Sequence, residues 1–178
     1  MSSTALLLPF ERPQGLTGLR LAVGVERLQA ELQLTYQLQG PLDQLLLPAA
    51  SSQPERRDLL WQHSCLELFM STAEDPGYWE VNVAATGDWA IYRLEGYRQG
   101  LQAAAEYSAL PIRQQRRADN WKVQFKLPLP AAVTANSSLM LGVTAVLEQS
   151  DGTLSYWALA HPGEQPDFHH RDSFQLAA

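Results

Sequence analysis

Cysteine is almost absent from this sequence, which has one, Cys65, among 178 residues. One cysteine cannot form an intrachain disulfide or build a thiolate metal cage from this chain alone. The nearby His63 does not predict a nucleophile pair, because two residues apart on a strand places side chains next to each other rather than aimed at each other. We therefore predict that Cys65 is a buried structural residue.

Long apolar runs and an excess of basic residues are missing as well. No run approaches the roughly 20 apolar residues of a membrane span, and the apolar stretch at residues 5–8 is too short for a signal-peptide core. The net charge of −6 repels phosphate backbones. We expect no membrane partner, no nucleic-acid partner and a cytoplasmic location.

The remaining composition is that of a folded protein. Hydrophobic residues make up 46% of the chain and charged residues only 18%, which excludes the signature of disorder. A length of 178 residues is close to the usual size of one domain. We predict a single domain over residues 1–178.

Two-residue periodicity is the main structural signal. Apolar residues alternate with polar ones over residues 28–38, which predicts a strand with one buried face, and Gly40 and Pro41 end it. Helical patterning is scarce, so at most one short helix is expected, within residues 97–110. Similar signals predict further strands at residues 19–25, 65–71, 78–95 (a hairpin), 121–127, 139–147, 156–159 and 174–176. About nine short strands predict an all-β, antiparallel β-sandwich.

The predicted hairpin carries the candidate binding surface. With a loop of two or four residues, Glu80 lies opposite Arg93 and shares a face with Trp89, whereas an odd loop changes this pairing. An aromatic ring beside carboxylate, amide and guanidinium groups suits a sugar, which stacks on the ring and hydrogen-bonds through its hydroxyls. The alternative is an ordinary Glu80–Arg93 ion pair with Trp89 at the core edge. The candidate surface comprises Tyr78, Glu80, Asn82, Trp89 and Arg93, with Glu67, Tyr97 and Arg98 alongside.

Other chemistry has weaker signals. The histidines of the segment at residues 161–172, His161, His169 and His170, are of types that bind zinc or manganese, but their spacing matches no helical metal motif. We predict no metal site and keep these three as the alternative. No nucleophile elbow, phosphate loop or dinucleotide fingerprint is present, so we expect no enzyme activity. A glycosidase that uses Glu67 and Glu80 is the remaining catalytic alternative.

Three blocks of the sequence resemble bacterial DOMON-like domains, which are related to the family 9 carbohydrate-binding modules. The blocks are residues 61–69 (WQHSCLELF), residues 78–93 with YWEVN and GDWAIYR, and residues 161–174 from HPG to FHHRDSF. The likeness extends over about residues 21–174. It implies an immunoglobulin-like or jelly-roll β-sandwich of DOMON type whose members bind sugars or haem on one sheet.

The resemblance also implies site residues. Carbohydrate modules of this kind clamp sugars between tryptophans, and alternation directs Trp79 and Trp121 inward, which leaves Trp61, Trp89 and Trp157 as platforms. Haem-binding relatives use a methionine and a histidine as axial ligands, which here makes Met70 or Met140 with His161 or His169 the alternative. We therefore predict a non-catalytic domain without a cofactor that binds a carbohydrate or sugar-like molecule. Haem binding, metal binding and docking of a protein partner are the alternatives.

Overall fold

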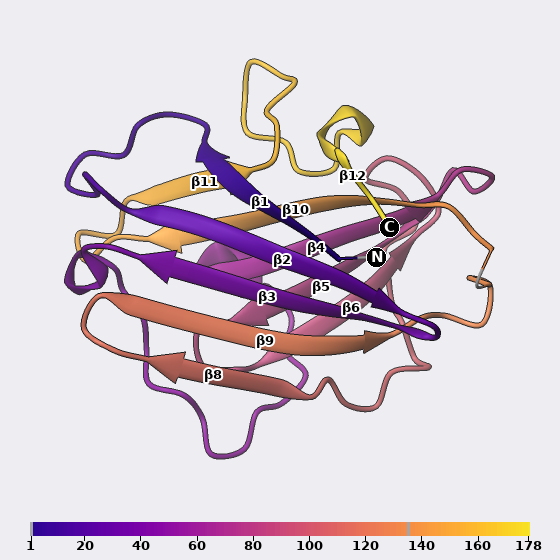
Figure 1. The fold of residues 1–178 in the computed structure, drawn as a ribbon, viewed down its shortest axis with the longest axis horizontal. Helices are drawn as coiled ribbons and strands as arrows, with labels where there is room; N and C mark the ends of the chain where they lie inside the picture. The colour runs from indigo at the N-terminus through magenta and orange to yellow at the C-terminus, as the bar shows by residue number, and fades with distance from the viewer. Residues whose placement is uncertain (1, 135) are drawn as a thin grey trace.

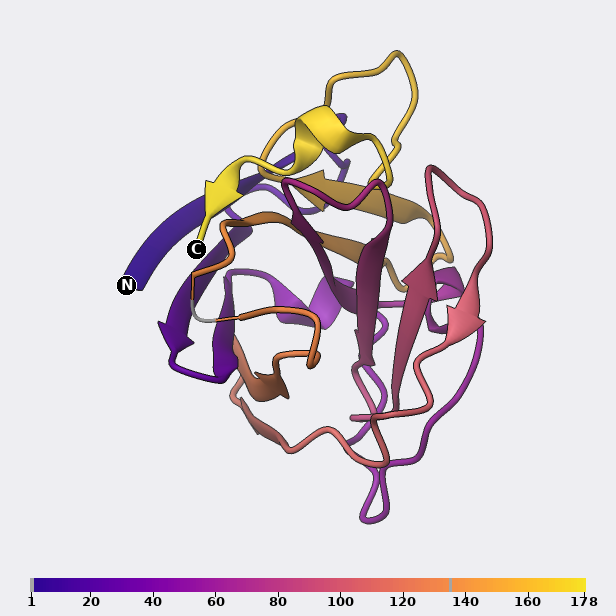
Figure 2. The same cartoon turned by 90° about the vertical axis from the view of Figure 1, so that its right-hand side faces the viewer.

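The computed structural model describes residues 2–134 and 136–178, which form two antiparallel β-sheets packed face to face (Figures 1 and 2). Sheet A has the strand order β1-β2-β3-β9-β8, and sheet B has the order β7-β6-β5-β4-β10-β11, with β12 paired to the start of β10. The strands of sheet A are β1 (Ser2–Pro9), β2 (Arg20–Leu28), β3 (Glu31–Gln39), β9 (Asn120–Pro128) and β8 (Ile112–Arg116). Those of sheet B are β7 (Gln102–Ala103), β6 (Trp89–Leu94), β5 (Tyr78–Ala84), β4 (Cys65–Thr72), β10 (Leu139–Glu148), β11 (Leu154–Ala158) and β12 (Leu176–Ala177). The predicted antiparallel β-sandwich is confirmed.

Strand β1 belongs to both sheets. Residues 2–7 pair with β2 in sheet A, and Leu8 and Pro9 pair with β11 in sheet B. A hydrogen bond from the Phe10 N–H to the Tyr156 carbonyl (2.8 Å) extends this second pairing. The strand therefore joins the two layers along one side of the sandwich.

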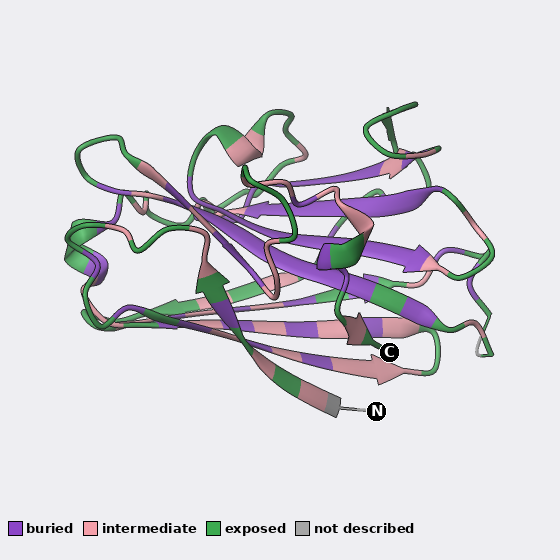
Figure 3. Ribbon diagram, turned by 90° about the horizontal axis from the view of Figure 1, so that it is seen from above, coloured by how far each residue is buried: buried purple, intermediate pink, exposed green. Residues whose placement is uncertain are grey.

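The main core lies between the sheets. In β3 and β9 every second residue is buried, as the alternation predicts (Figure 3). These residues belong to one core cluster with buried residues of sheet B. Leu66, Leu68 and Met70 of β4 point into this core, also as predicted. The Tyr36 hydroxyl of β3 crosses the core and donates a 2.6 Å hydrogen bond to the Glu67 backbone carbonyl of β4.

Sheet B is buried on its outer face as well, so β4 and β5 are buried along almost their whole length (Figure 3). Two segments lie over this face, residues 95–101 and residues 159–175, which we call the cover. Phe168 and Phe174 of the cover pack on Phe69, with ring centroids 6.4 and 5.9 Å apart. Gly142 of β10 lies beneath Phe174, and a Cβ at this position would stand 2.7 Å from the phenylalanine ring.

The described residues contain no α-helix and only three 3-10 turns, η1 (Leu42–Gln44), η2 (Leu60–Gln62) and η3 (Arg171–Ser173). Residues 97–110 contain the short strand β7 rather than a helix. Within the described part of the chain, no helix combines the length and the apolar character that crossing a bilayer requires. Strands β1, β7 and β8 have no counterpart among the predicted strands.

Candidate ligand-binding site

A pocket lies between the outer face of sheet B and the cover. Its cavity has a volume of about 360 Å³. Sheet B forms the floor, η2 and β11 contribute one wall, and the cover closes the other side. The lining residues are Trp61, Glu67, Phe69, Glu80, Arg98, Leu101, Val146, Tyr156, Pro166, Phe168 and His169.

The polar part of the floor consists of three buried side chains. Glu67 on β4 is paired directly with Asn82 on β5, and Glu80 precedes Asn82 by two residues. The period of a strand therefore directs all three side chains to the outer face. Asn82 Nδ2 donates to Glu80 Oε1 (2.8 Å), and the Thr144 hydroxyl of β10 donates to Glu67 Oε2 (3.3 Å). Their exposed fractions are 2% for Glu67, 4% for Glu80 and 0% for Asn82.

Each of these three side chains also has an oxygen without a hydrogen-bond partner among the described residues. The atoms are Glu67 Oε1, Glu80 Oε2 and Asn82 Oδ1. Buried polar atoms in folded proteins almost always have a partner, and an unpaired one costs about 1–3 kcal/mol. Three unpaired acceptors beside a cavity therefore mark a surface built to receive donors from a guest molecule.

Burial changes the ionisation of both acidic groups. Burial and, after it, the negative charge of Glu80 raise the pKa of Glu67, whereas hydrogen bonds from Thr144 and Cys65 lower it, and the result is a pKa of about 8. Burial also raises the pKa of Glu80, against the opposing hydrogen bond from Asn82 and the positive charge of Arg98. The floor of the pocket is thus an environment that disfavours uncompensated negative charge.

Aromatic rings form much of the wall. Tyr156 of β11 packs edge-on against Phe168, with centroids 6.1 Å apart. Trp61 of η2 packs edge-on against Tyr92, also at 6.1 Å. Such rings offer apolar faces for the C–H surfaces of a ligand, while the floor supplies polar contacts.

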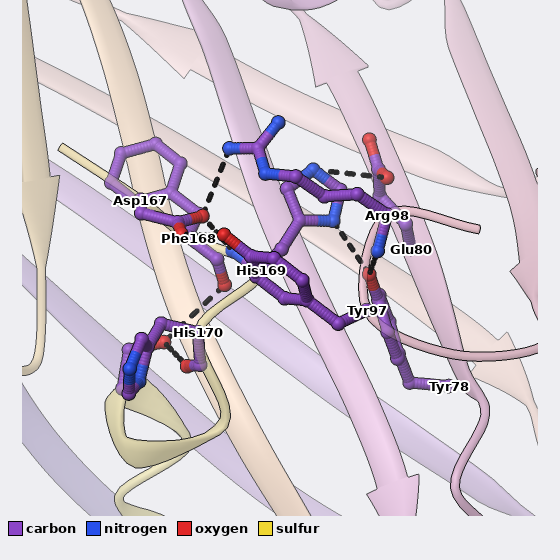
Figure 4. Close-up of polar contacts among 9 residues, drawn as sticks. Tyr78, Glu80, Tyr97, Arg98, Asp167, Phe168, His169 and His170 are labelled. Atoms are coloured by element: carbon purple, nitrogen blue, oxygen red, sulfur yellow. Dashed lines mark hydrogen bonds and ion pairs between the residues drawn. The ribbon is translucent and has the colours of Figure 1, made fainter.

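His169 connects the cover to the floor (Figure 4). Its Nδ1 lies 2.7 Å from the Tyr78 hydroxyl of β5, and its Nε2 lies 4.0 Å from Glu80 Oε2. Burial and, after it, the positive charge of Arg98 lower the pKa of His169, Asp167 opposes them, and the result is a pKa of about 4. The imidazole is therefore neutral at neutral pH and adds no positive charge beside Glu80.

The two parts of the cover are joined through Asp167 (Figure 4). Arg98 Nη2 donates to Asp167 Oδ1 (2.9 Å), and the Tyr97 hydroxyl donates to Asp167 Oδ2 (2.5 Å). Arg98 also has a positive φ of 53°, a conformation that is uncommon for a residue other than glycine. Its backbone N–H donates to the Tyr78 hydroxyl (3.2 Å), which helps to hold this conformation over the pocket.

The structure brings six of the predicted site residues together. Glu67, Glu80 and Asn82 share the outer face of sheet B with Tyr78, as predicted, and Trp61 and Arg98 come to the same pocket from η2 and from the cover. Their placement side by side follows from the strand period and from the cover. Their role in binding stays a prediction.

The prediction that Trp89 and Arg93 share this face is wrong. The hairpin loop has an odd number of residues, since the Ala84 N–H bonds to the Asp88 carbonyl around three residues, and Glu80 therefore pairs with Tyr92. Trp89 is 4% exposed and lies in the core between the sheets. Arg93 stacks over the Trp79 ring at 4.2 Å and pairs with Asp75 at 2.5 Å.

Trp157 is not a platform either. It is 4% exposed and belongs to the core between the sheets, with its Nε1 donating to the Ser155 hydroxyl (3.0 Å). The neighbouring Tyr156 points outward, and it is this residue that lines the pocket. Because Trp157 points into the core, alternation along β11 directs the side chain of Tyr156 to the outer face. The sequence did not indicate which of these two side chains points inward.

The residues named for a metal or a haem are dispersed. His161 Nε2 lies 2.8 Å from the Leu8 carbonyl, and His170 Nδ1 accepts the Asp172 N–H at the start of η3. No group of three or more metal-binding side chains occurs among residues 2–134 and 136–178. Met70 lies in the core whereas His169 lies on the opposite face of sheet B, so they do not form an axial pair.

Several pocket residues were not identified from the sequence. Phe69 shares the face of Glu67 by alternation, so the signal for it was present. Phe168 lies 99 residues further along the chain, and no local pattern indicates that the two rings meet. Leu101 and Pro166 come from the cover, whose path the sequence does not define.

Comparisons with known proteins bear on the fold. No family model matches the chain, and no curated protein matches it. Among solved structures, the "putative carbohydrate-binding protein" of Bacteroides uniformis ATCC 8492 is similar with a TM-score of 0.69 at 12% identity, over 97% of this chain and 84% of that one. A family 9 carbohydrate-binding module of Caldicellulosiruptor kristjanssonii, in complex with cellotriose, is similar with a TM-score of 0.54 at 12% identity, over 88% and 72% of the two chains. The chain therefore has the β-sandwich fold of these two proteins.

Proposed function

We propose that this chain is a non-catalytic carbohydrate-binding protein of DOMON type that holds a small sugar in the pocket on sheet B. The observation that carries the proposal is the cluster of unpaired oxygens on Glu67, Glu80 and Asn82, beside a covered cavity that Glu67 and Glu80 line together with aromatic side chains. Sugars need this combination, because their hydroxyls form directed hydrogen bonds while their C–H faces pack on rings.

The size of the cavity favours a short ligand. At about 360 Å³ it lies at the lower end of the range for small-molecule sites, roughly 300–1,000 Å³. A monosaccharide or a disaccharide fits this range better than a long chain does. The similar fold of a module solved in complex with cellotriose supports a sugar as the ligand class.

The ionisation of the floor favours binding over hydrolysis. A retaining glycosidase needs one ionised carboxylate as the nucleophile beside one protonated acid. In this pocket burial raises the pKa of Glu67 to about 8 and also raises the pKa of Glu80, and both shifts disfavour an ionised nucleophile.

Calorimetric titration with a panel of neutral and amino monosaccharides and disaccharides tests the proposal. We expect at least one sugar to bind, and Trp61→Ala and Asn82→Ala to weaken its binding at least tenfold, while the melting curves show folded variants. Glu106→Gln, at an exposed position outside the pocket, should bind as the wild type does. Titrations without heat for every sugar, together with unchanged tryptophan fluorescence, would refute the proposal.

A further inference from the structure

The floor of the pocket has more acceptors than donors. Asn82 Nδ2 and the Thr144 hydroxyl, the side-chain donors bonded there, are used on Glu80 Oε1 and Glu67 Oε2. What remains for a guest is the set of three unpaired oxygens on Glu67, Glu80 and Asn82. A sugar hydroxyl both donates and accepts, whereas an ammonium group carries three donors and no acceptor. Three unpaired oxygens in one cluster match the three donors of an ammonium group.

The floor has little positive charge to balance its carboxyl groups, because Arg98 lowers the pKa of Glu80 but forms its ion pair with Asp167. Among the described residues, His169 is the one basic side chain within 4.0 Å of the carboxyl group of Glu67 or Glu80. Its Nε2 lies 4.0 Å from Glu80 Oε2. Burial lowers the pKa of that imidazole to about 4, so it is uncharged at neutral pH. Arg98, the other basic residue of the pocket, forms its ion pair with Asp167 at 2.9 Å. A buried carboxylate is costly unless a cation joins it, and an ammonium group of a ligand would join Glu80 directly. Glu67, whose pKa is about 8, is mostly protonated at pH 7 and would ionise when such a group binds.

The walls favour the same kind of guest. Phe69, Phe168, Trp61 and Tyr156 all line the cavity, and aromatic faces attract a cation that is withdrawn from water. These rings also pack on the carbon skeleton of a sugar. The rings and the acidic floor therefore select the same ligand.

We propose that the pocket prefers a sugar that carries a protonated primary amine, with its ammonium group on Glu67, Glu80 and Asn82 and its ring against the aromatic walls. This inference rests on the proposed carbohydrate-binding function and specifies its substrate class. The amine supplies three donors and a positive charge to this acidic floor.

Matched sugars test this preference on the wild-type protein. Calorimetric titration at pH 7 would compare D-glucosamine and D-galactosamine with D-glucose, D-galactose and the two N-acetylated amino sugars. We expect at least one amino sugar to bind at least tenfold more tightly than both its parent sugar and its acetylated form. Acetylation keeps the nitrogen but removes the charge and two donors, so it should abolish the preference.

The isosteric variant Glu80→Gln assigns the preference to the floor. It should reduce the affinity ratio between the amino sugar and its parent at least fivefold, and Glu106→Gln should leave this ratio unchanged. Equal binding of amino and parent sugars by the wild type would overturn this inference alone, and so would an unchanged ratio in Glu80→Gln. An absence of binding for every sugar would overturn the proposed function and the inference together.

Discussion

Glu67 makes contacts on both faces of sheet B. Its backbone carbonyl accepts the Tyr36 hydrogen bond from the core side, and its side chain stands in the pocket floor on the other side. Burial raises its pKa from the ordinary 4.5 to about 8. Between these two values the folded protein keeps a proton that the unfolded chain releases. The free energy of unfolding therefore falls as the pH rises through this window.

The variant Glu67→Gln should relieve this penalty. We expect its melting temperature, relative to the wild type, to rise by at least about 4 °C between pH 5 and pH 9, since one pKa unit corresponds to about 1.4 kcal/mol and each kcal/mol to about 2–4 °C. Differential scanning calorimetry across this range measures the effect. Glu106→Gln is the control, and a difference that does not vary with pH would contradict the prediction.

At the scale of elements, the cover depends on close packing over β10. Gly142 leaves the space that the Phe174 ring occupies, and Phe174 begins the return of the chain to β12. The cover also places Phe168 and His169 on the pocket. The shape of the binding site thus depends on a residue that does not line it.

The substitution Gly142→Ala tests this dependence. Its new methyl group would meet the Phe174 ring at 2.7 Å, and we expect a loss of about 1–3 kcal/mol in the free energy of unfolding, as for other overpacked sites. Urea denaturation measures this loss, and hydrogen exchange should increase in residues 159–175. Gly96→Ala is the matched control because a Cβ there has no neighbour within 4 Å. Equal stability of the two variants would show that Phe174 adjusts freely.

Sequence periodicity predicted the elements better than it predicted their partners. Glu67 and Phe69 were assigned to the correct face because alternation within β4 is a local property. Trp89 was assigned to the wrong face because one residue more or fewer in the hairpin loop changes the sheet face of every side chain that follows. The leucines of β1 do not alternate with polar residues, so Leu6, which is 62% exposed, and Leu7, which is 3% exposed, look the same in the sequence.

The pocket itself could be predicted only in part. Its floor comes from the neighbouring strands β4 and β5, and alternation along β5 predicts that Glu80 and Asn82 share one face. Its walls require Phe168 to return over Phe69, and the irregular cover has no periodicity from which to infer this path. Residues from regular elements were therefore found, and most residues from the cover were not.

At the scale of the whole molecule, few polar contacts cross the core between the two sheets. The bond from the Tyr36 hydroxyl to the Glu67 carbonyl is one of them, and Tyr36 is fully buried. Burial is also the largest of the effects that raise the pKa of Tyr36, so the hydroxyl stays protonated and able to donate. This bond fixes the position of β3 against β4 and supports the pocket floor from behind.

Removing this hydroxyl should weaken the whole sandwich. We expect Tyr36→Phe to lower the free energy of unfolding by about 1–3 kcal/mol, because the Glu67 carbonyl loses a buried partner. Tyr156→Phe is a suitable control, since the Tyr156 hydroxyl has no hydrogen bond among the described residues. Equal denaturation midpoints for the two variants would contradict a stabilising role for the bond.

The shared strand β1 also affects the order of folding. Its pairing with β2 joins neighbouring segments, but Leu8 and Pro9 meet β11 only after a loop of about 150 residues has closed. The entropy lost in closing such a long loop delays this step relative to the formation of local hairpins. The pairing of β1 with β11 therefore forms late in folding. Mutations in residues 154–158 should slow refolding less than they accelerate unfolding.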